Sequence, residues 1–316
     1  MNWGGSIILA IKEIKHVKIA SFTLMTASIN VILTFITTIF LLIILGLVSA
    51  FAPQNPVIGN SIVPLGIGFI FILPISAFFI TLAFNFFYAL LYNVLVPILG
   101  GIKLGLDGEE VNTIPVVPFA LILSAIGAIM ALILGIFLAA VIVPLLSVLS
   151  GSVPGLSQIF ANITNSTPTN LPSGAVLGTA EVVIALFLIV GLPILAFIGG
   201  FINNALTAIF YNFIATRVSK IKLEFGVISG SLNELKSIPV IPTALSVAVV
   251  FLIFGIINGL FSLINNIAQG MVTAGIGAFI GNIIFYFIGY FIFVALTAFF
   301  YNWLAPKIGR IKIELE

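Results

Sequence analysis

Side chains that could take part in catalysis are few and scattered along the chain. It has one histidine, His16, no cysteine and nine acidic residues among its 316. A hydrolase-type site needs a nucleophile, a base and an orienting group together, and a metal centre needs several His, Cys or carboxylate ligands. No such set can be assembled here, because His16 lies in the polar N-terminal lead. We therefore expect no enzymatic activity, no metal and no cofactor.

Glu181 is the one carboxylate placed where it invites a functional reading. It is the only charged residue between Glu110 and Arg217, and it stands where the fourth apolar segment begins. A carboxylate within a membrane span often marks a functional site. At a span boundary it can instead cap a helix N-terminus, whose dipole favours negative charge. Both readings stay open, and Glu181→Gln with unchanged activity and stability would favour the structural one.

The most regular polar pattern is a motif that occurs three times. Each copy has a Tyr-Asn pair and an Ile-Lys pair, with the Lys eleven residues after the Tyr, and each follows a long apolar segment. A second signature opens the units: Thr113–Leu121 resembles Ser237–Leu245, and His16–Leu24 matches more weakly. The motif residues are Tyr92, Asn93 and Lys103; Tyr211, Asn212 and Lys222; and Tyr301, Asn302 and Lys312.

A polar stripe precedes each motif tyrosine by four and seven residues. This spacing places its members on one face of a helix. In lipid such side chains need partners, so the stripe predicts hydrogen bonds between helices or, alternatively, the lining of a polar path. The members are Asn85, Tyr88 and Tyr92; Asn204, Thr207 and Tyr211; and, with Val294 at the first position, Thr297 and Tyr301.

Two prolines recur at the same place in the repeat. Pro74 and Pro193 each stand eighteen residues before the motif tyrosine, whereas the third copy has Ile283. A proline inside a span removes a backbone hydrogen bond and clashes with the preceding turn. We expect a kink at Pro74 and at Pro193.

The elements that must position these residues are apolar helices. Hydrophobic residues make up 61% of the chain and charged residues 6%, which indicates an integral membrane protein. A helical span needs about 20 apolar residues, and the runs are continuously apolar rather than alternating, which favours helices over a barrel. Six such runs are expected, at about 19–51, 63–96, 115–149, 180–218, 240–268 and 275–304.

Charge separates the two sides of these spans. The chain ends and the segments 103–113 and 217–238 hold all eleven Lys and Arg, whereas the loops 52–62, 150–179 and 269–274 hold none. By the positive-inside rule both termini are cytoplasmic. We expect a multi-pass protein of the cell (plasma) membrane, in contact with the bilayer and with anionic headgroups and not with nucleic acid. Asn162 and Asn165 begin sequons in the long outer loop.

The units follow from the repeat. Residues 1–18 form a cytoplasmic lead, for which we predict an amphipathic surface helix, the alternative being a basic flank. Ala50–Ala52 has the pattern of a cleavage triplet, but the repeat requires the first span, so it is expected to be retained. The three units are residues 19–108, 113–226 and 237–316. The predicted fold is all-α, with six transmembrane helices in three parallel two-helix repeats, a pseudo-threefold arrangement.

Each unit ends in a short alternating tail. The period of two is typical of a strand. Three tails on the cytoplasmic side could pair into a small sheet, and we predict that Ile311–Leu315 pairs with Ile102–Leu106 or Ile221–Phe225. The alternative is an extended segment lying on the headgroups.

The unit resembles a family of small bacterial membrane proteins of uncharacterised function. In that family two spans flank a variable outer loop, and Tyr-Asn, Gly-Gly and a short alternating tail follow. Here the first copy has Gly100-Gly101 between Tyr92-Asn93 and the tail, whereas the second has Ser219-Lys220. The resemblance implies a membrane location and a two-span unit, and it brings no activity.

Two functions are consistent with these features. The first is a non-enzymatic protein that organises the membrane or contacts partners or lipids through its tails and loops. The second is a channel or transporter along the axis between the three repeats. Mitochondrial-type carriers share the three-repeat architecture, but their Pro-x-acid-x-x-base motif does not occur here.

Overall fold

The computed structural model describes residues 10–51, 63–142, 144–145 and 182–316. The chain divides into two compact units. One contains Met1–Phe119 and Leu206–Glu316, and the other contains Ala120–Ala205. The strands and the Tyr-Asn motifs belong to the first unit. Glu181, Asn162, Asn165 and the whole of the loop 150–179 lie outside the described residues.

Within the described residues, six helices are long and apolar enough to cross a membrane, which confirms the predicted multi-pass architecture. Their boundaries agree closely with the apolar runs wherever the run is fully described. The helices are α1 (Ile19–Phe51), α2 (Val63–Leu99), α3 (Val116–Phe137), α7 (Leu192–Phe210), α9 (Val240–Ala268) and α10 (Val272–Ile308), with π-helical turns η2 (Leu138–Ile142), η3 (Phe187–Gly191) and η4 (Tyr211–Ala215) and the short α8 (Thr216–Val218).

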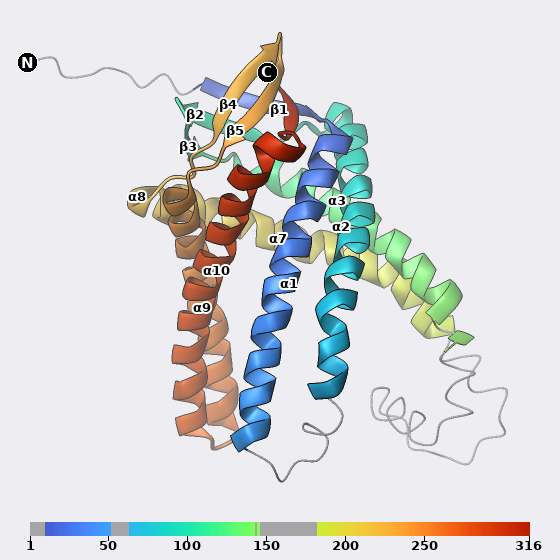
Figure 1. Cartoon of the computed structure of the whole chain (residues 1–316), viewed down its shortest axis with the longest axis vertical. Helices are drawn as coiled ribbons and strands as arrows, with labels where there is room; N and C mark the ends of the chain where they lie inside the picture. Colours follow the sequence, from blue (N-terminus) through green and yellow to red (C-terminus); the bar gives the residue numbers. More distant parts are fainter. Residues whose placement is uncertain (1–9, 52–62, 143, 146–181) are drawn as a thin grey trace, which may run out of the picture. The chain divides into compact units, whose positions relative to one another are not determined.

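Small residues allow the helices to pack in pairs. In the first unit α1 lies beside α2, and α9 beside α10 (Figure 1). A Cβ added to Gly255 would lie 2.8 Å from Tyr286, and one added to Gly259 would lie 2.9 Å from Phe279. In the second unit a Cβ on Gly135 would lie 2.0 Å from the Leu188 carbonyl oxygen. Close backbone approach of this kind is how helices associate in lipid.

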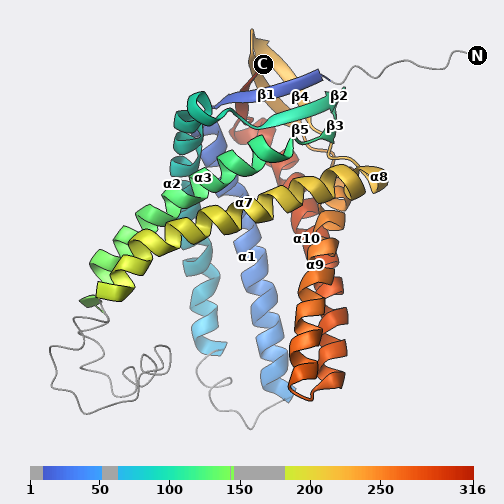
Figure 2. The ribbon, with the colours of Figure 1, turned by 180° about the vertical axis from the view of Figure 1, so that it is seen from behind.

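Six strands form an antiparallel sheet at one end of the first unit (Figures 1 and 2). They occur in the order β3-β2-β1-β6-β5-β4, so the sheet interleaves strands from the beginning, middle and end of the chain. The strands are β1 (Ala10–Val17), β2 (Lys103–Asp107), β3 (Glu110–Thr113), β4 (Glu224–Ser229), β5 (Leu232–Ser237) and β6 (Lys312–Leu315).

The sheet closes into a ring. The Val111 N–H donates to the Ile221 carbonyl at 2.9 Å, and the Leu223 N–H donates to the Glu109 carbonyl at 2.9 Å. A bridge between Glu110 and Lys222 lies between these bonds. The edge strand β3 therefore pairs with the residues just before the other edge strand, β4. We call the closed set of six strands the strand ring.

Two predictions about the strands are wrong. Residues 10–17 form the strand β1 and not a surface helix, because their backbone groups pair with β2 and with β6. Tertiary pairing thus overrides the helical spacing of the isoleucines. The last strand, β6, pairs with β1 and β5, and not with β2 or β4. The strands that precede α1, α3 and α9, namely β1, β3 and β5, are absent from the prediction, and they lie between the tails.

Apolar side chains occupy the inside of the ring. Leu106, Phe225 and Leu315, one from each tail, line the same cavity at its end. Residues two and four positions earlier face the same side, because side chains alternate along a strand. They are also aliphatic, and all are buried or half-buried: Leu104, Leu223 and Ile313, then Ile102, Ile221 and Ile311.

Candidate functional site

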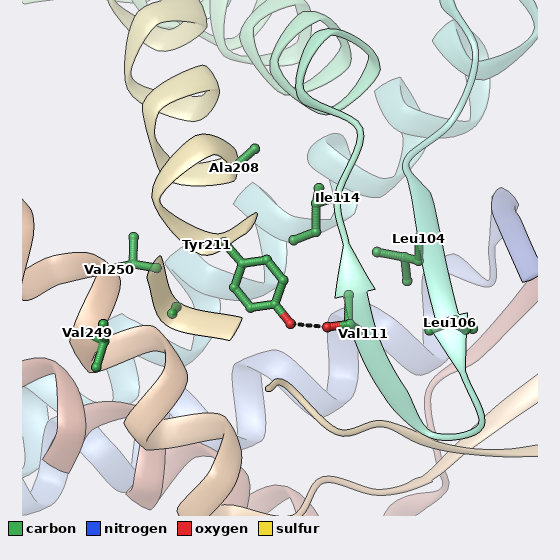
Figure 3. Packing of buried hydrophobic residues seen from close by; sticks show 9 residues of the cluster. Leu104, Leu106, Val111, Ile114, Ala208, Tyr211, Val249 and Val250 are labelled. Carbon is green, nitrogen blue, oxygen red and sulfur yellow. Dashed lines mark hydrogen bonds between the residues drawn. The ribbon is translucent and has the colours of Figure 1, made fainter. Parts of the chain in front are cut away.

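The motif tyrosine of the second copy connects the strand β3 to the segment just before β4, and Figure 3 shows its bond to Val111 of β3. The Tyr211 hydroxyl donates a hydrogen bond to the Val111 carbonyl and accepts one from the Ile221 N–H at 3.2 Å. Tyr211 is buried among Val111, Ile114, Val249 and other apolar side chains. One hydroxyl therefore connects the strand before the first helix of the copy to the tail after its second helix.

The first and third copies repeat this arrangement. The Tyr92 hydroxyl donates to the Ile14 carbonyl at 2.7 Å and accepts from the Ile102 N–H at 2.9 Å. The Tyr301 hydroxyl donates to the Leu235 carbonyl at 2.5 Å and accepts from the Ile311 N–H at 3.4 Å. The acceptor in each copy also gives its own N–H to the tail: Ile14 to Ile102, Val111 to Ile221, and Leu235 to Ile311, each at 2.9 Å.

The motif asparagines act on the same strands, three residues further on. The Asn212 side chain accepts from the Ile114 N–H at 2.8 Å and donates to the Ile114 carbonyl at 2.8 Å. Asn93 does the same with Val17, and Asn302 with Ile238. One amide side chain satisfies both the N–H and the carbonyl of a residue at or just after the end of the strand, before the helix that follows it begins. We call each set of five hydrogen bonds a junction.

The motif lysines lie outside the ring, next to glutamates of the neighbouring strands. Lys222 is 3.0 Å from Glu110, and Lys103 is 4.0 Å from Glu13. The third copy differs, because Glu234 pairs with Arg310 at 2.5 Å, while Lys312 is bound through its N–H to the Ser21 hydroxyl. In each of the three copies, therefore, a basic residue of the tail pairs with a glutamate of the neighbouring strand.

These contacts shift the pKa of three carboxyls in one direction. Hydrogen bonds from Lys220 and Lys222 hold the pKa of Glu110 below its usual 4.5. The pKa of Glu13 is lowered chiefly by the Gly101 N–H, and that of Glu314 by Lys18. All three carboxylates are therefore charged at neutral pH and occupied by structural partners, which does not suit a proton-transfer role.

The sequence reading missed the glutamate strands, although a signal was present. Just before the first helix of each copy, the sequence has a glutamate, an apolar residue, a residue of any type, a polar residue and a second apolar residue. The matched openers began only at the polar position, three residues too late. The pattern covers 13–17 (EIKHV), 110–114 (EVNTI) and 234–238 (ELKSI).

The polar stripe is only partly a set of contacts between helices. The Asn85 amide donates to the Thr26 hydroxyl of α1 at 2.8 Å, and Asn30 donates to Thr81 of α2 at 2.5 Å. Thr297 instead donates to the Phe293 carbonyl of its own helix. Tyr88 is half-buried in α2, and Asn204 and Thr207 lie on opposite sides of the division between the two units.

Both predicted kink prolines lie within helical segments. Pro74 is inside α2. Pro193 follows η3, where the Leu192 N–H bonds to the Phe187 carbonyl five residues earlier. A π-helical turn and a proline are both causes of bends, so the kinks stay predictions with a local cause at Pro193.

Metal chemistry finds no support in the described residues. No group of three or more His, Asp or Glu that could hold a metal occurs within 10–51, 63–142, 144–145 and 182–316. The Tyr and Asn side chains of the motif bond to backbone groups in all three junctions. Each junction thereby attaches a strand to the helix that carries the Tyr-Asn pair. No protein-family model, curated protein or solved structure matches this chain.

Proposed function

We propose that the protein is a non-enzymatic membrane scaffold built from three tandem two-helix repeats in a pseudo-threefold arrangement. The observation that carries the proposal is the recurrence of one junction, with the same five hydrogen bonds, at Tyr92, Tyr211 and Tyr301. Each junction uses its polar groups on backbone, which suits assembly and not turnover. The role of the scaffold is to hold three helical hairpins on one strand ring and present that ring to lipids or partners.

The scaffold sits in the cell (plasma) membrane with the ring and both termini in the cytoplasm. Charge supports this orientation, because every Lys and Arg lies in or next to the ring. Arg217 and Lys307 occupy equivalent positions at helix ends, and the Lys307 ammonium lies 3.5 Å from the centre of the Trp303 ring. An aromatic ring and a long basic side chain at a helix end are interfacial anchors, and they attract anionic headgroups.

The likeness of the unit to small bacterial two-span membrane proteins fits the same proposal. In this chain the unit occurs three times, and each copy contributes one strand before its first helix and one strand after its second helix. A single unit would keep the pairing between its own two strands but would leave the other edge of each strand without a partner. Three units together close the ring.

A channel along the axis between the repeats is the alternative, and the ring argues against it. A path through the ring would have to pass three layers of aliphatic and aromatic side chains contributed by the tails. Water and ions do not cross so dry a constriction without dewetting costs.

The test is lipid composition around the purified protein. The protein is extracted with its native lipids in polymer nanodiscs, and the anionic fraction is measured by mass spectrometry. We expect enrichment over the bulk membrane, and at least a twofold loss of it in Arg217→Gln/Lys307→Gln. Lys12→Gln, at the far end of the ring, is the control for charge alone. Equal lipid composition in all variants, or saturable solute flux in liposomes, would contradict the proposal.

A further inference from the structure

A cavity of about 240 Å³ opens at the end of the strand ring that faces away from the helices. The tails run from the helix ends towards it, and β1 starts beside it at Ala10. Its walls come from all three tails and from the strands between them. The residues that line it include Leu106, Phe225, Leu315, Lys12, Glu109 and Asn233.

The floor and the rim of this cavity differ in chemistry. Leu106, Phe225 and Leu315 form an apolar floor. Lys12, Glu109 and Asn233 stand at matched positions, each two residues before the strand residue that accepts the tyrosine hydroxyl. Because side chains alternate along strands, Lys12 of β1 and Asn233 of β5 project to the inside of the ring. Glu109, in the turn before β3, lines the same cavity. The rim therefore carries a cation, an anion and an amide above apolar side chains.

The two rim charges are unpaired within the described part of the chain. Neither Lys12 nor Glu109 forms an ion pair there, although both border one cavity and both are exposed. The glutamates one position further, at 13, 110 and 234, are all paired on the outside of the ring. Asn233 is only 5% exposed, and its amide donates to the Ser231 carbonyl at 2.7 Å, which fixes its orientation.

We propose that this cavity binds a free apolar α-amino acid. The carboxylate of the ligand meets Lys12, its ammonium meets Glu109, and its side chain rests on Leu106, Phe225 and Leu315. Charge complementarity selects this class, because the rim offers one partner for each end of a zwitterion. This binding goes beyond the scaffold role and does not depend on it.

Size supports a ligand of this class. The cavity is smaller than the roughly 300–1,000 Å³ of sites for drug-sized molecules. Leucine is smaller than a drug-sized molecule, whereas a lipid or a nucleotide is not.

Calorimetric titration of the full chain in nanodiscs tests the proposal with leucine as the probe. Leucinamide lacks the carboxylate, and 4-methylpentanoate lacks the ammonium. We expect one leucine to bind per chain and each analogue to bind at least tenfold more weakly. Equal binding of all three would show a merely apolar cavity, and no saturable leucine binding would also overturn the proposal.

Two variants assign the rim residues. Lys12→Gln should weaken leucine at least tenfold and leave leucinamide unchanged, while Glu109→Gln should weaken leucine and leave 4-methylpentanoate unchanged. Lys15→Gln, on the outer side of the same strand, is the matched control and should bind leucine as the parent does. If both rim variants bind leucine normally, the assignment fails. The analogue series on the parent chain needs no variant and so does not depend on variant folding.

Discussion

The strand ring and the helices use polar side chains in opposite ways. In the ring, Tyr and Asn side chains join segments separated by 64 to 100 residues. In the helices, several polar side chains bond to a carbonyl one turn earlier in the same helix, which links nothing else. Examples are Thr38, Ser124, Asn258, Asn266, Asn282 and Thr297.

This difference indicates which interactions determine how the segments pair. A helix face of Phe, Ile and Leu packs against lipid about as well as against another helix, so it selects partners weakly. A buried tyrosine hydroxyl with a carbonyl on one side and an N–H on the other has few substitutes. We infer that the junctions define which strand pairs with which helix, while the helices supply membrane residence.

The largest effect that we expect from a single substitution is at the first junction, whose tail residue Gly101 has no counterpart in the other two copies. A Cβ added to Gly101 would lie 2.2 Å from the Ile14 carbonyl oxygen and 3.1 Å from the Tyr92 hydroxyl. Gly101→Ala must therefore shift the β1 backbone, and we expect a loss of about 3 kcal/mol in unfolding free energy. Denaturant unfolding in detergent measures it. Lys220→Ala, at the matching position, should lose less than about 1 kcal/mol; equal losses would contradict the distinction.

Removing a junction asparagine should rank next. Asn212→Ala leaves the N–H and carbonyl of Ile114 without their side-chain partners. Each orphaned backbone group costs about 1–3 kcal/mol when shielded from water, so we expect a total loss of about 2–3 kcal/mol. Thermal and denaturant unfolding of Asn93→Ala and Asn302→Ala should give similar values. If the three losses of unfolding free energy differ from one another by more than the size of any one of them, the three junctions are not equivalent.

Polar residues within the membrane should matter less. Asn85→Leu removes one bond between α1 and α2, for which about 0.6 kcal/mol is typical in membrane proteins. Thr297→Val removes a bond within α10 alone and should change the unfolding free energy by less than that. The same unfolding measurements apply. A loss at Asn85 as large as at Asn212 would show that helix contacts carry as much specificity as the ring.

The smallest effect concerns pH. The pKa of Glu110 is lower in the folded protein than its usual 4.5, so its stabilisation is present above that value and disappears as pH falls through the lowered pKa. The carboxylate is a third exposed, so the contribution stays below about 1 kcal/mol. Glu110→Gln should flatten the acid limb of stability plotted from pH 6 to pH 3. An unchanged acid limb would place the titration elsewhere.

The sequence was informative about the helices and only partly about the ring. Continuous apolar runs identify spans because lipid demands them, and α9 begins and ends where the run 240–268 does. Strand pairing is different, because it depends on partners far away in the chain. The isoleucines of residues 7–17 fit a helix locally, yet β1 is held by β2 and β6. Recognising the glutamate strands would have placed the missing half of the ring, but not its order.

One measurement tests the central claim, that the junctions, each of which joins the first strand of a copy to its tail, stabilise the fold more than the polar contacts within the helices do. The full chain carrying Tyr92→Phe, Tyr211→Phe and Tyr301→Phe is compared with the chain carrying Thr38→Val, Asn258→Leu and Thr297→Val. Each lost hydroxyl leaves a carbonyl and an N–H unsatisfied, as Asn212→Ala does, so we predict a loss of about 6–9 kcal/mol in unfolding free energy for the three tyrosine changes together, and under about 1.5 kcal/mol for the other variant. Equal losses in the two variants would contradict the claim.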